Sequence, residues 1–342
     1  MQYADWSARS PRWAGIRSEV VDVRNTSVHL LRADANAEVP TDALPQVLLH
    51  PMAASASSWL DVLRPLTAYG PVIAPDLPGT FTGRTGLPRP NAARADINAR
   101  FVRALIATLG VDRVVVHGWS MGGLVALLFA DLAPERVEQL ILANPTLPGS
   151  LTTSQTIGWQ TAGRLALAVG PPVIRRLLRS LGPQLLNVKE RYADPEAGVA
   201  SWLDIPGGDL SRLSPETVAL LAEERDMVRS QPRQLSGAVT AFSSVVAAMY
   251  VDRGPAEKAI GRVVAPTLLL WGDRDLLIDR SVINRLTERR PDWDLHVFET
   301  VGHLLPLEVP AAYVDVVGQW LAKDRAAYQF PPPTGTLGPR QS

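Results

Sequence analysis

The chain contains no cysteine and no surplus of either charge, and each absence excludes a class of function. Without cysteine there are no disulfides, thiolate metal sites or cysteine nucleophiles. The 342 residues include 34 Lys and Arg against 34 Asp and Glu, which gives a formal net charge of zero. Because binding to phosphates requires a surplus of basic side chains, nucleic acid is excluded as the main partner.

Long apolar runs are also missing from the sequence. Residues Met1–Arg17 are largely polar and lack the apolar segment of a signal peptide. The longest apolar stretches, Leu124–Ala130 and Leu140–Ala143, are far shorter than the roughly 20 residues that span a bilayer. We therefore expect a soluble, cytoplasmic protein that does not bind a membrane.

Histidine is scarce, and the five histidines are too dispersed to form a cluster of metal ligands. No glycine-rich phosphate loop or dinucleotide-binding fingerprint follows an expected strand. We therefore expect neither a metal nor a cofactor, and a small molecule is the expected partner. The sequence leaves the oligomeric state open.

Short apolar strands alternate with segments of helical periodicity along most of the chain. The strands read as continuous apolar runs, which is typical of strands covered on both faces. After an opening hairpin, we expect them at 47–50, 72–74, 114–116, 140–142, 267–270 and 295–298. This alternation predicts an α/β fold, with a mostly parallel central sheet and helices on both faces.

The middle of the chain, residues 147–262, shows helical segments and no convincing strand. We expect it to form a helical cap inserted into the core, whose two parts are residues 1–146 and 263–325. Such an insertion follows the carboxyl end of a strand, where open α/β sheets bind ligands. Residues 326–342, with three consecutive prolines, are expected to form a flexible tail.

One motif carries the chemistry: Gly118-Trp119-Ser120-Met121-Gly122 fits the pattern G-x-S-x-G between an expected strand and an expected helix. Glycine allows the close backbone approach of this sharp turn, which exposes the Ser120 hydroxyl at the edge of the sheet. The helix that follows presents the free N–H of Met121 to negative charge. The motif therefore predicts Ser120 as a nucleophile, which needs a base for activation.

The expected base is His303, which lies in a loop after the last strand. Its place agrees with the chain order Ser, Asp, His that belongs to this kind of turn. The other histidines lie in the hairpin, near strand ends or within a strand, where they fit the role less well: His29, His50, His117 and His296.

The acid that orients the base is expected after the strand at 267–270. Asp275 is the prediction, and Asp273 is the alternative, although its side chain would also suit shaping the turn. The other strand end where an acid is common holds Asn144, which cannot carry the negative charge. That observation favours Asp275 as the partner that holds the His303 imidazole in one tautomer.

Together these motifs resemble the α/β-hydrolase-fold serine hydrolases that carry a helical cap. The resemblance covers about 19–146 and 263–323, and it rests on 118–123, 272–275, 302–303 and the segment beginning at His50. Members that use an aspartate nucleophile, the haloalkane dehalogenases and epoxide hydrolases, are disfavoured because Ser120 occupies that position.

The resemblance also implies an oxyanion hole and a substrate pocket. Proline follows His50 and has no N–H, so the hole is assigned to the N–H groups of Met52 and Met121. His50, Trp59 and Trp119 are the expected substrate-binding residues, with packing in the core as the alternative for the two tryptophans. Asp76, which follows the strand at 72–74, is expected to be structural.

The function implied is a serine hydrolase that cleaves an ester, lactone or thioester of a small, apolar substrate through an acyl-enzyme on Ser120. Two alternatives stay open. One is a carbon–carbon bond hydrolase, which uses the same triad. The other is a non-catalytic ligand-binding protein that keeps the fold.

Overall fold

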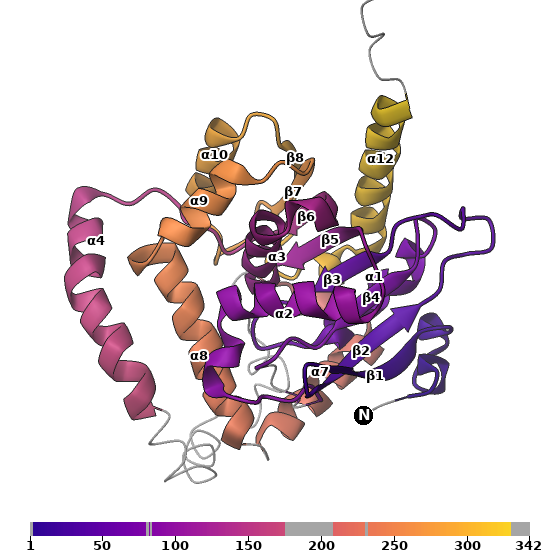
Figure 1. The fold of residues 1–342 in the computed structure, drawn as a ribbon, viewed down its shortest axis with the longest axis horizontal. Coiled ribbons are helices and arrows are strands. Elements are labelled where there is room, and N and C mark those ends of the chain that lie inside the picture. The colour runs from indigo at the N-terminus through magenta and orange to yellow at the C-terminus, as the bar shows by residue number, and fades with distance from the viewer. Residues whose placement is uncertain (1–2, 80–81, 83, 175–207, 230–231, 330–342) are drawn as a thin grey trace, which may run out of the picture.

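A computed structural model describes residues 3–79, 82, 84–174, 208–229 and 232–329 of the chain. Its centre is one eight-stranded sheet, in the order β1-β2-β4-β3-β5-β6-β7-β8 (Figure 1). The strands β4, β3, β5, β6, β7 and β8 are parallel to one another, whereas β2 is antiparallel to both β1 and β4. The expected mostly parallel sheet is confirmed. The strand bounds are β1 Arg17–Val23, β2 Thr26–Ala33, β3 Gln46–Leu49, β4 Val72–Pro75, β5 Val114–Trp119, β6 Val137–Ala143, β7 Thr267–Gly272 and β8 Asp294–Phe298.

The central strands are apolar on both faces because each face meets a different layer of helices. In β5, Val116 belongs to one hydrophobic cluster and Val115 to the other. In β6, Leu140 and Ile141 divide in the same way. Side chains alternate across a strand, so a strand covered on both sides has no polar face and reads as a continuous apolar run.

The first cluster is contributed by α2, α3, α8, α9 and α10, and the second by α1, α7, α11 and α12. Figure 1 shows α2 and α3 in front of the sheet. The bounds are α1 Leu60–Leu66, α2 Ala95–Thr108, α3 Met121–Leu132, α4 Thr153–Gly158, α7 Pro215–Arg229, α8 Pro232–Val246, α9 Gly254–Arg262, α10 Arg280–Arg289, α11 Leu305–Glu308 and α12 Pro310–Gln329.

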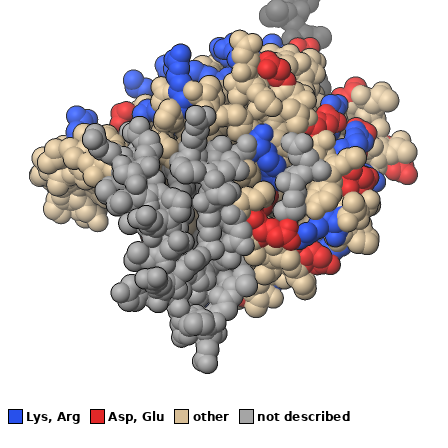
Figure 2. Space-filling view, turned by 90° about the horizontal axis from the view of Figure 1, so that it is seen from below, with Lys and Arg blue, Asp and Glu red and all other residues tan. Residues whose placement is uncertain are grey.

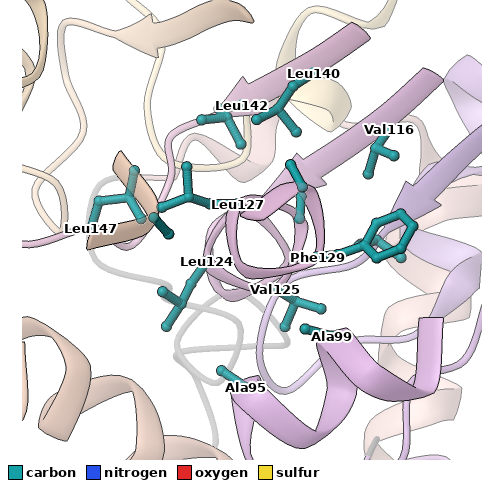
Figure 3. Packing of buried hydrophobic residues seen from close by; sticks show 14 of the residues in the cluster. Ala95, Ala99, Val116, Leu124, Val125, Leu127, Phe129, Leu140, Leu142 and Leu147 are labelled. Atoms are coloured by element: carbon teal, nitrogen blue, oxygen red, sulfur yellow. The ribbon is translucent and has the colours of Figure 1, made fainter. Parts of the chain in front are cut away.

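The helix α3, which follows the G-x-S-x-G motif, lies in the middle of the first cluster. Figure 3 shows its side chains between the strands and α2, where Leu124, Val125 and Phe129 are fully buried. A helix that is apolar on nearly every side is stable only when neighbours surround it. The position of the N-terminus of α3 is therefore fixed by packing.

Between β6 and β7, the described residues form helices and no strand. Residues 175–207 and 230–231 of the expected cap lie outside the described residues. The last helix of this stretch, α9, packs with α3 in the first cluster. The last helix, α12, continues to Gln329, so residues 326–329 of the expected tail are helical. Residues 319–330 contain no glycine or proline, and the two alanines at 326 and 327 favour helix.

The described surface is mixed in charge. On the face drawn in Figure 2, Lys and Arg side chains lie among Asp and Glu side chains, as the zero net charge suggests. None of the described helices combines the length and apolarity needed to cross a bilayer.

Candidate active site

The turn between β5 and α3 places Ser120 at the carboxyl edge of the sheet. Its backbone lies in a rare region, with φ of 55° and ψ of −117°, and such strain persists only where the surroundings impose it. The neighbouring glycines explain how the turn fits. A Cβ on Gly118 would lie 2.5 Å from the carbonyl oxygen of Gly122, and one on Gly122 would overlap the carbonyl oxygen of Leu49. The expected strand–turn–helix context of the motif is present.

The structure brings Ser120 together with His303, which lies 183 positions further along the chain. The Nε2 atom of His303 is 3.0 Å from the Ser120 Oγ, and both side chains are buried. This distance is within the range in which an imidazole accepts the proton of a hydroxyl.

Asp275 lies on the other side of the imidazole. Its Oδ2 is 2.8 Å from the His303 Nδ1, while its Oδ1 accepts hydrogen bonds from the backbone N–H groups of Leu277 at 2.7 Å and Ile278 at 3.0 Å. Those two donors fix the carboxylate, which in turn fixes the imidazole tautomer with its proton on Nδ1.

Asp273, the alternative acid, does not contact His303. Its backbone N–H donates to the Phe298 carbonyl at 3.0 Å, and its buried Oδ1 has no hydrogen-bond partner. The turn-shaping bonds expected for Asp273 are made instead by Asp275, so one carboxylate both shapes the turn and contacts His303.

Two residues that the sequence did not single out as functional hold the His303 loop. Glu308 accepts the N–H groups of Gly302 at 2.9 Å and of Leu304 at 3.0 Å. Asn144 donates its amide to the carbonyl oxygens of Gly302 at 3.0 Å and of His303 at 3.1 Å.

Asn144 also reaches β7, the strand that precedes Asp275. Its Oδ1 accepts the N–H of Gly272 at 3.0 Å, so one buried amide joins the end of β7 to the His303 loop. A carboxylate at this position would lose the donors to both carbonyls. Asn144, which follows β6 where an acid is common, thus makes a set of bonds that needs a side chain able both to donate and to accept, as an amide can.

The expected oxyanion donors lie on neighbouring segments. Met121 is the first residue of α3, and the first N–H groups of a helix have no intrahelical acceptor. Met52 follows β3, which pairs with β5 so that Leu49 lies opposite Gly118. The chain at Leu49 and His50 touches Gly122, so the segment of Met52 begins beside the N-terminus of α3.

The three expected substrate-binding side chains are almost fully enclosed. Relative exposure is 1% for His50, 0% for Trp59 and 1% for Trp119, which leaves almost no surface for a ligand. The indole N–H of Trp119 donates to the His303 carbonyl at 2.9 Å, and its ring meets Trp59 edge to face at 5.8 Å. For both tryptophans the structure favours the packing alternative.

His50 has a similar structural position. Its Nδ1 lies 2.8 Å from the Pro51 carbonyl oxygen, and its Nε2 accepts the N–H of Leu77 at 3.0 Å. Burial lowers the pKa of His50, which favours the neutral ring that this pair of bonds requires. His50 therefore ties the Met52 segment to the chain after β4.

Asp76 lies at the centre of a buried polar network below the Met52 segment. It accepts the N–H of Ala56 at 2.6 Å and contacts Arg84 at 2.9 Å and His29 at 3.1 Å. The other side of Arg84 binds Glu224 of α7 at 2.7 Å. Burial opposes ionisation of Asp76, but Arg84 and His29 outweigh it and hold the pKa of Asp76 well below its usual range.

The arrangement of a strained serine, an imidazole and a carboxylate around parallel strands defines a class of hydrolase, and comparison with known proteins gives the same class. The chain belongs to the alpha/beta hydrolase family, whose model matches residues 46–316.

The similar proteins include several kinds of hydrolase. One is 2-hydroxy-6-oxononadienedioate/2-hydroxy-6-oxononatrienedioate hydrolase 1 of Dechloromonas aromatica, which is 29% identical over 75% of this chain and 79% of the relative. The fold is shared with a serine hydrolase of Cycloclasticus zankles (TM-score 0.64, 21% identity, 90% of this chain and 98% of that one). It is also shared with naproxen esterase of Bacillus subtilis (TM-score 0.60, 19% identity, 92% and 95%).

Proposed function

We propose that the protein is a serine hydrolase that cleaves an ester, lactone or thioester through an acyl-enzyme on Ser120. The observation that carries this proposal is the continuous hydrogen-bond chain from the Ser120 Oγ through the His303 imidazole to the Asp275 carboxylate. In this chain each group has one chemical role, as nucleophile, general base and orienting acid.

Acylation uses all three groups at once. The Ser120 proton passes to the Nε2 of His303 while Oγ attacks the substrate carbonyl. Asp275 stabilises the imidazolium that forms, and the N–H groups of Met52 and Met121 receive the developing oxyanion. One such donor is worth about 3–4 kcal/mol of transition-state stabilisation. The imidazolium then gives its proton to the leaving group, whose bond to the acyl carbon breaks.

Deacylation repeats the sequence with water. His303 takes a proton from water as the oxygen attacks the acyl carbon, and the same N–H groups hold the second oxyanion. Collapse of this intermediate breaks the bond between carbon and the Ser120 Oγ, which takes the proton back from His303. The products are a carboxylic acid and the free enzyme.

The substrate we propose is small and apolar. Met121 follows Ser120, and Leu147 follows β6. Both belong to the same apolar cluster as Val245 of α8 and the nearby Met249, and Met52 packs against that cluster. We infer that residues 147–262 act as a cap over Ser120 and select the acyl group, because pockets lined by such side chains favour apolar ligands.

Carbon–carbon bond cleavage is the second candidate, because similar proteins are named as hydrolases of 2-hydroxy-6-oxononadienedioate. Such a dianionic substrate calls for cationic groups that are not already neutralised. The buried guanidinium near the Met52 segment, Arg84, is bound by two carboxylates, Asp76 and Glu224. Around the Met52 segment, as far as the chain is described, this charge balance favours the neutral acyl substrate.

The test combines labelling with turnover. A fluorophosphonate should label Ser120, and a panel of p-nitrophenyl esters, lactones and thioesters should be hydrolysed. Ser120→Ala and His303→Ala should each lower kcat on the order of 10⁴–10⁶-fold. Asp275→Asn should lower kcat far more than its matched control Asp273→Asn.

The same panel separates the alternatives. Faster consumption of a 2-hydroxy-6-oxodienoate than of any ester would establish the carbon–carbon reaction instead. If Ser120 is not labelled and no substrate is turned over, the non-catalytic ligand-binding protein is the alternative that remains.

A further inference from the structure

A second hydroxyl touches the reacting oxygen. The Oγ1 of Thr146 lies 3.2 Å from the Ser120 Oγ, and Thr146 is buried. Within the described part of the chain, this is the one hydrogen bond that the Thr146 hydroxyl makes. The sequence pattern around Thr146 did not identify it as a site residue.

Backbone contacts, one of them with Ser120 itself, hold Thr146 in place. The N–H of Thr146 donates to the carbonyl oxygen of Ser120 at 3.1 Å. Pro145 packs so closely on α3 that a Cβ on Gly123 would lie 2.7 Å from the proline Cβ. Asn144, with φ of 42°, turns the chain into this position. The hydroxyl is therefore built into the turn that presents the nucleophile.

The protons of this cluster can be assigned from their partners. The Nδ1 of His303 faces the Asp275 carboxylate, which accepts only, so Nδ1 carries the proton and Nε2 accepts. Ser120 has one proton, and it goes to Nε2. The remaining bond, between the two hydroxyls, must then be a donation from Thr146 to the Ser120 Oγ.

We propose that Thr146 is a further catalytic residue, which donates to the Ser120 Oγ and acts mainly in deacylation. This inference rests on the proposed acyl-enzyme. In the acyl-enzyme, Oγ is the single-bonded oxygen of an ester and a poor acceptor. As the bond from carbon to Oγ breaks, the electron pair moves to Oγ, which becomes a strong acceptor until the proton arrives from the Nε2 of His303.

Acylation gains less from the same bond. The free Ser120 hydroxyl already accepts from Thr146 before it attacks, so the hydrogen bond changes little on the way to the first transition state. Only interactions that strengthen between ground state and transition state accelerate a step. The Thr146 hydroxyl should therefore lower the barrier to release of the acyl group and leave the barrier to its formation nearly unchanged.

The test is pre-steady-state hydrolysis of a p-nitrophenyl ester by Thr146→Val, which keeps the shape and removes the hydroxyl. We expect kcat and KM to fall together by about five- to tenfold, the effect of one neutral hydrogen bond, with kcat/KM within about twofold of wild type. A burst of p-nitrophenol should report accumulation of the acyl-enzyme. Thr146→Ser should restore kcat, and Thr287→Val, which removes a hydroxyl from α10, should change nothing.

An unchanged kcat in Thr146→Val, or a fall in kcat/KM without a burst, would overturn the inference. So would a Thr146→Ser enzyme that behaves like Thr146→Val. If valine prevents folding, the pair Thr146→Ala and Thr146→Ser gives the same comparison. Failure of the fluorophosphonate to label wild-type Ser120 would instead refute the proposed function, which separates the two results.

Discussion

Replacing Asp76 by Asn should destabilise the protein strongly, because the carboxylate neutralises a buried cation. Asp76 is 0% exposed, and its Oδ2 lies 2.9 Å from the Arg84 Nε. The amide keeps the shape but removes the negative charge. Its NH₂ group replaces either Oδ1, which accepts the N–H of Ala56, or Oδ2, which contacts His29 and Arg84, so one acceptor is lost in either orientation. The pKa of Asp76 is well below its usual range, so the wild-type group is ionised at neutral pH.

The expected loss follows from what remains around Arg84. Removing one partner of a buried ion pair costs about 3–5 kcal/mol, because the other charge is left uncompensated. Here Glu224 still binds Arg84 at 2.7 Å, which places the expected value near the lower end, at about 3 kcal/mol. Against a total unfolding free energy of about 5–15 kcal/mol, this is a large fraction.

Urea unfolding followed by tryptophan fluorescence measures the difference. The matched control is Asp34→Asn, which breaks the pair of Arg17 and Asp34 at 2.9 Å, where both side chains are exposed. An exposed pair contributes about 0–1 kcal/mol, so the control should stay close to wild type. If Asp76→Asn lies within about 1 kcal/mol of wild type with an unchanged m-value, the argument from buried charge is wrong.

Two further predictions concern the turn and the core. Gly122→Ala should prevent folding or lower the free energy of unfolding by more than about 3 kcal/mol, because its Cβ overlaps the Leu49 carbonyl. In the control Gly254→Ala in α9, the new Cβ meets nothing within 4 Å, so the change should be neutral or stabilising. Thermal unfolding of the two variants followed by circular dichroism tests this. Burial lowers the pKa of His117 to about 3, so the unfolded state binds more protons below pH 6.5 and stability falls there. Between pH 7 and pH 5 the wild type should lose about 2 kcal/mol from this group, and a His117→Gln variant with the same pH profile in urea titrations would contradict it.

The parts of the fold that the sequence predicts are those specified by nearby residues. The opening hairpin turns at Arg24 and Asn25, both with positive φ, between two alternating strands. The turn at Ser120 needs glycine at fixed offsets within a few positions of the serine. His303 and Asp275 could be proposed from the sequence because each follows a strand, in the chain order Ser, Asp, His that accompanies the turn at Ser120.

The residues that support the site were not predictable, because their partners are distant in the chain. Asn144 binds groups 128 to 159 positions away, and Glu224 meets Ser55 across 169 positions. Nothing near these side chains in the sequence marks them. Trp6 and Trp13 are likewise buried through contacts with the second cluster, in a segment without strand or helix periodicity.

The contacts of the His303 carbonyl have a consequence for how this protein can diverge. That oxygen is held by Trp119 at the end of β5 and by Asn144 just past the end of β6, so the imidazole is aligned by the sheet. Changes of sequence between β6 and β7 that keep the packing of α9 on α3 should therefore leave Ser120, His303 and Asp275 hydrogen-bonded to one another. New substrates should be reachable by grafting the segments before α9 from a relative, provided that the graft keeps a carboxylate where Glu224 meets Arg84.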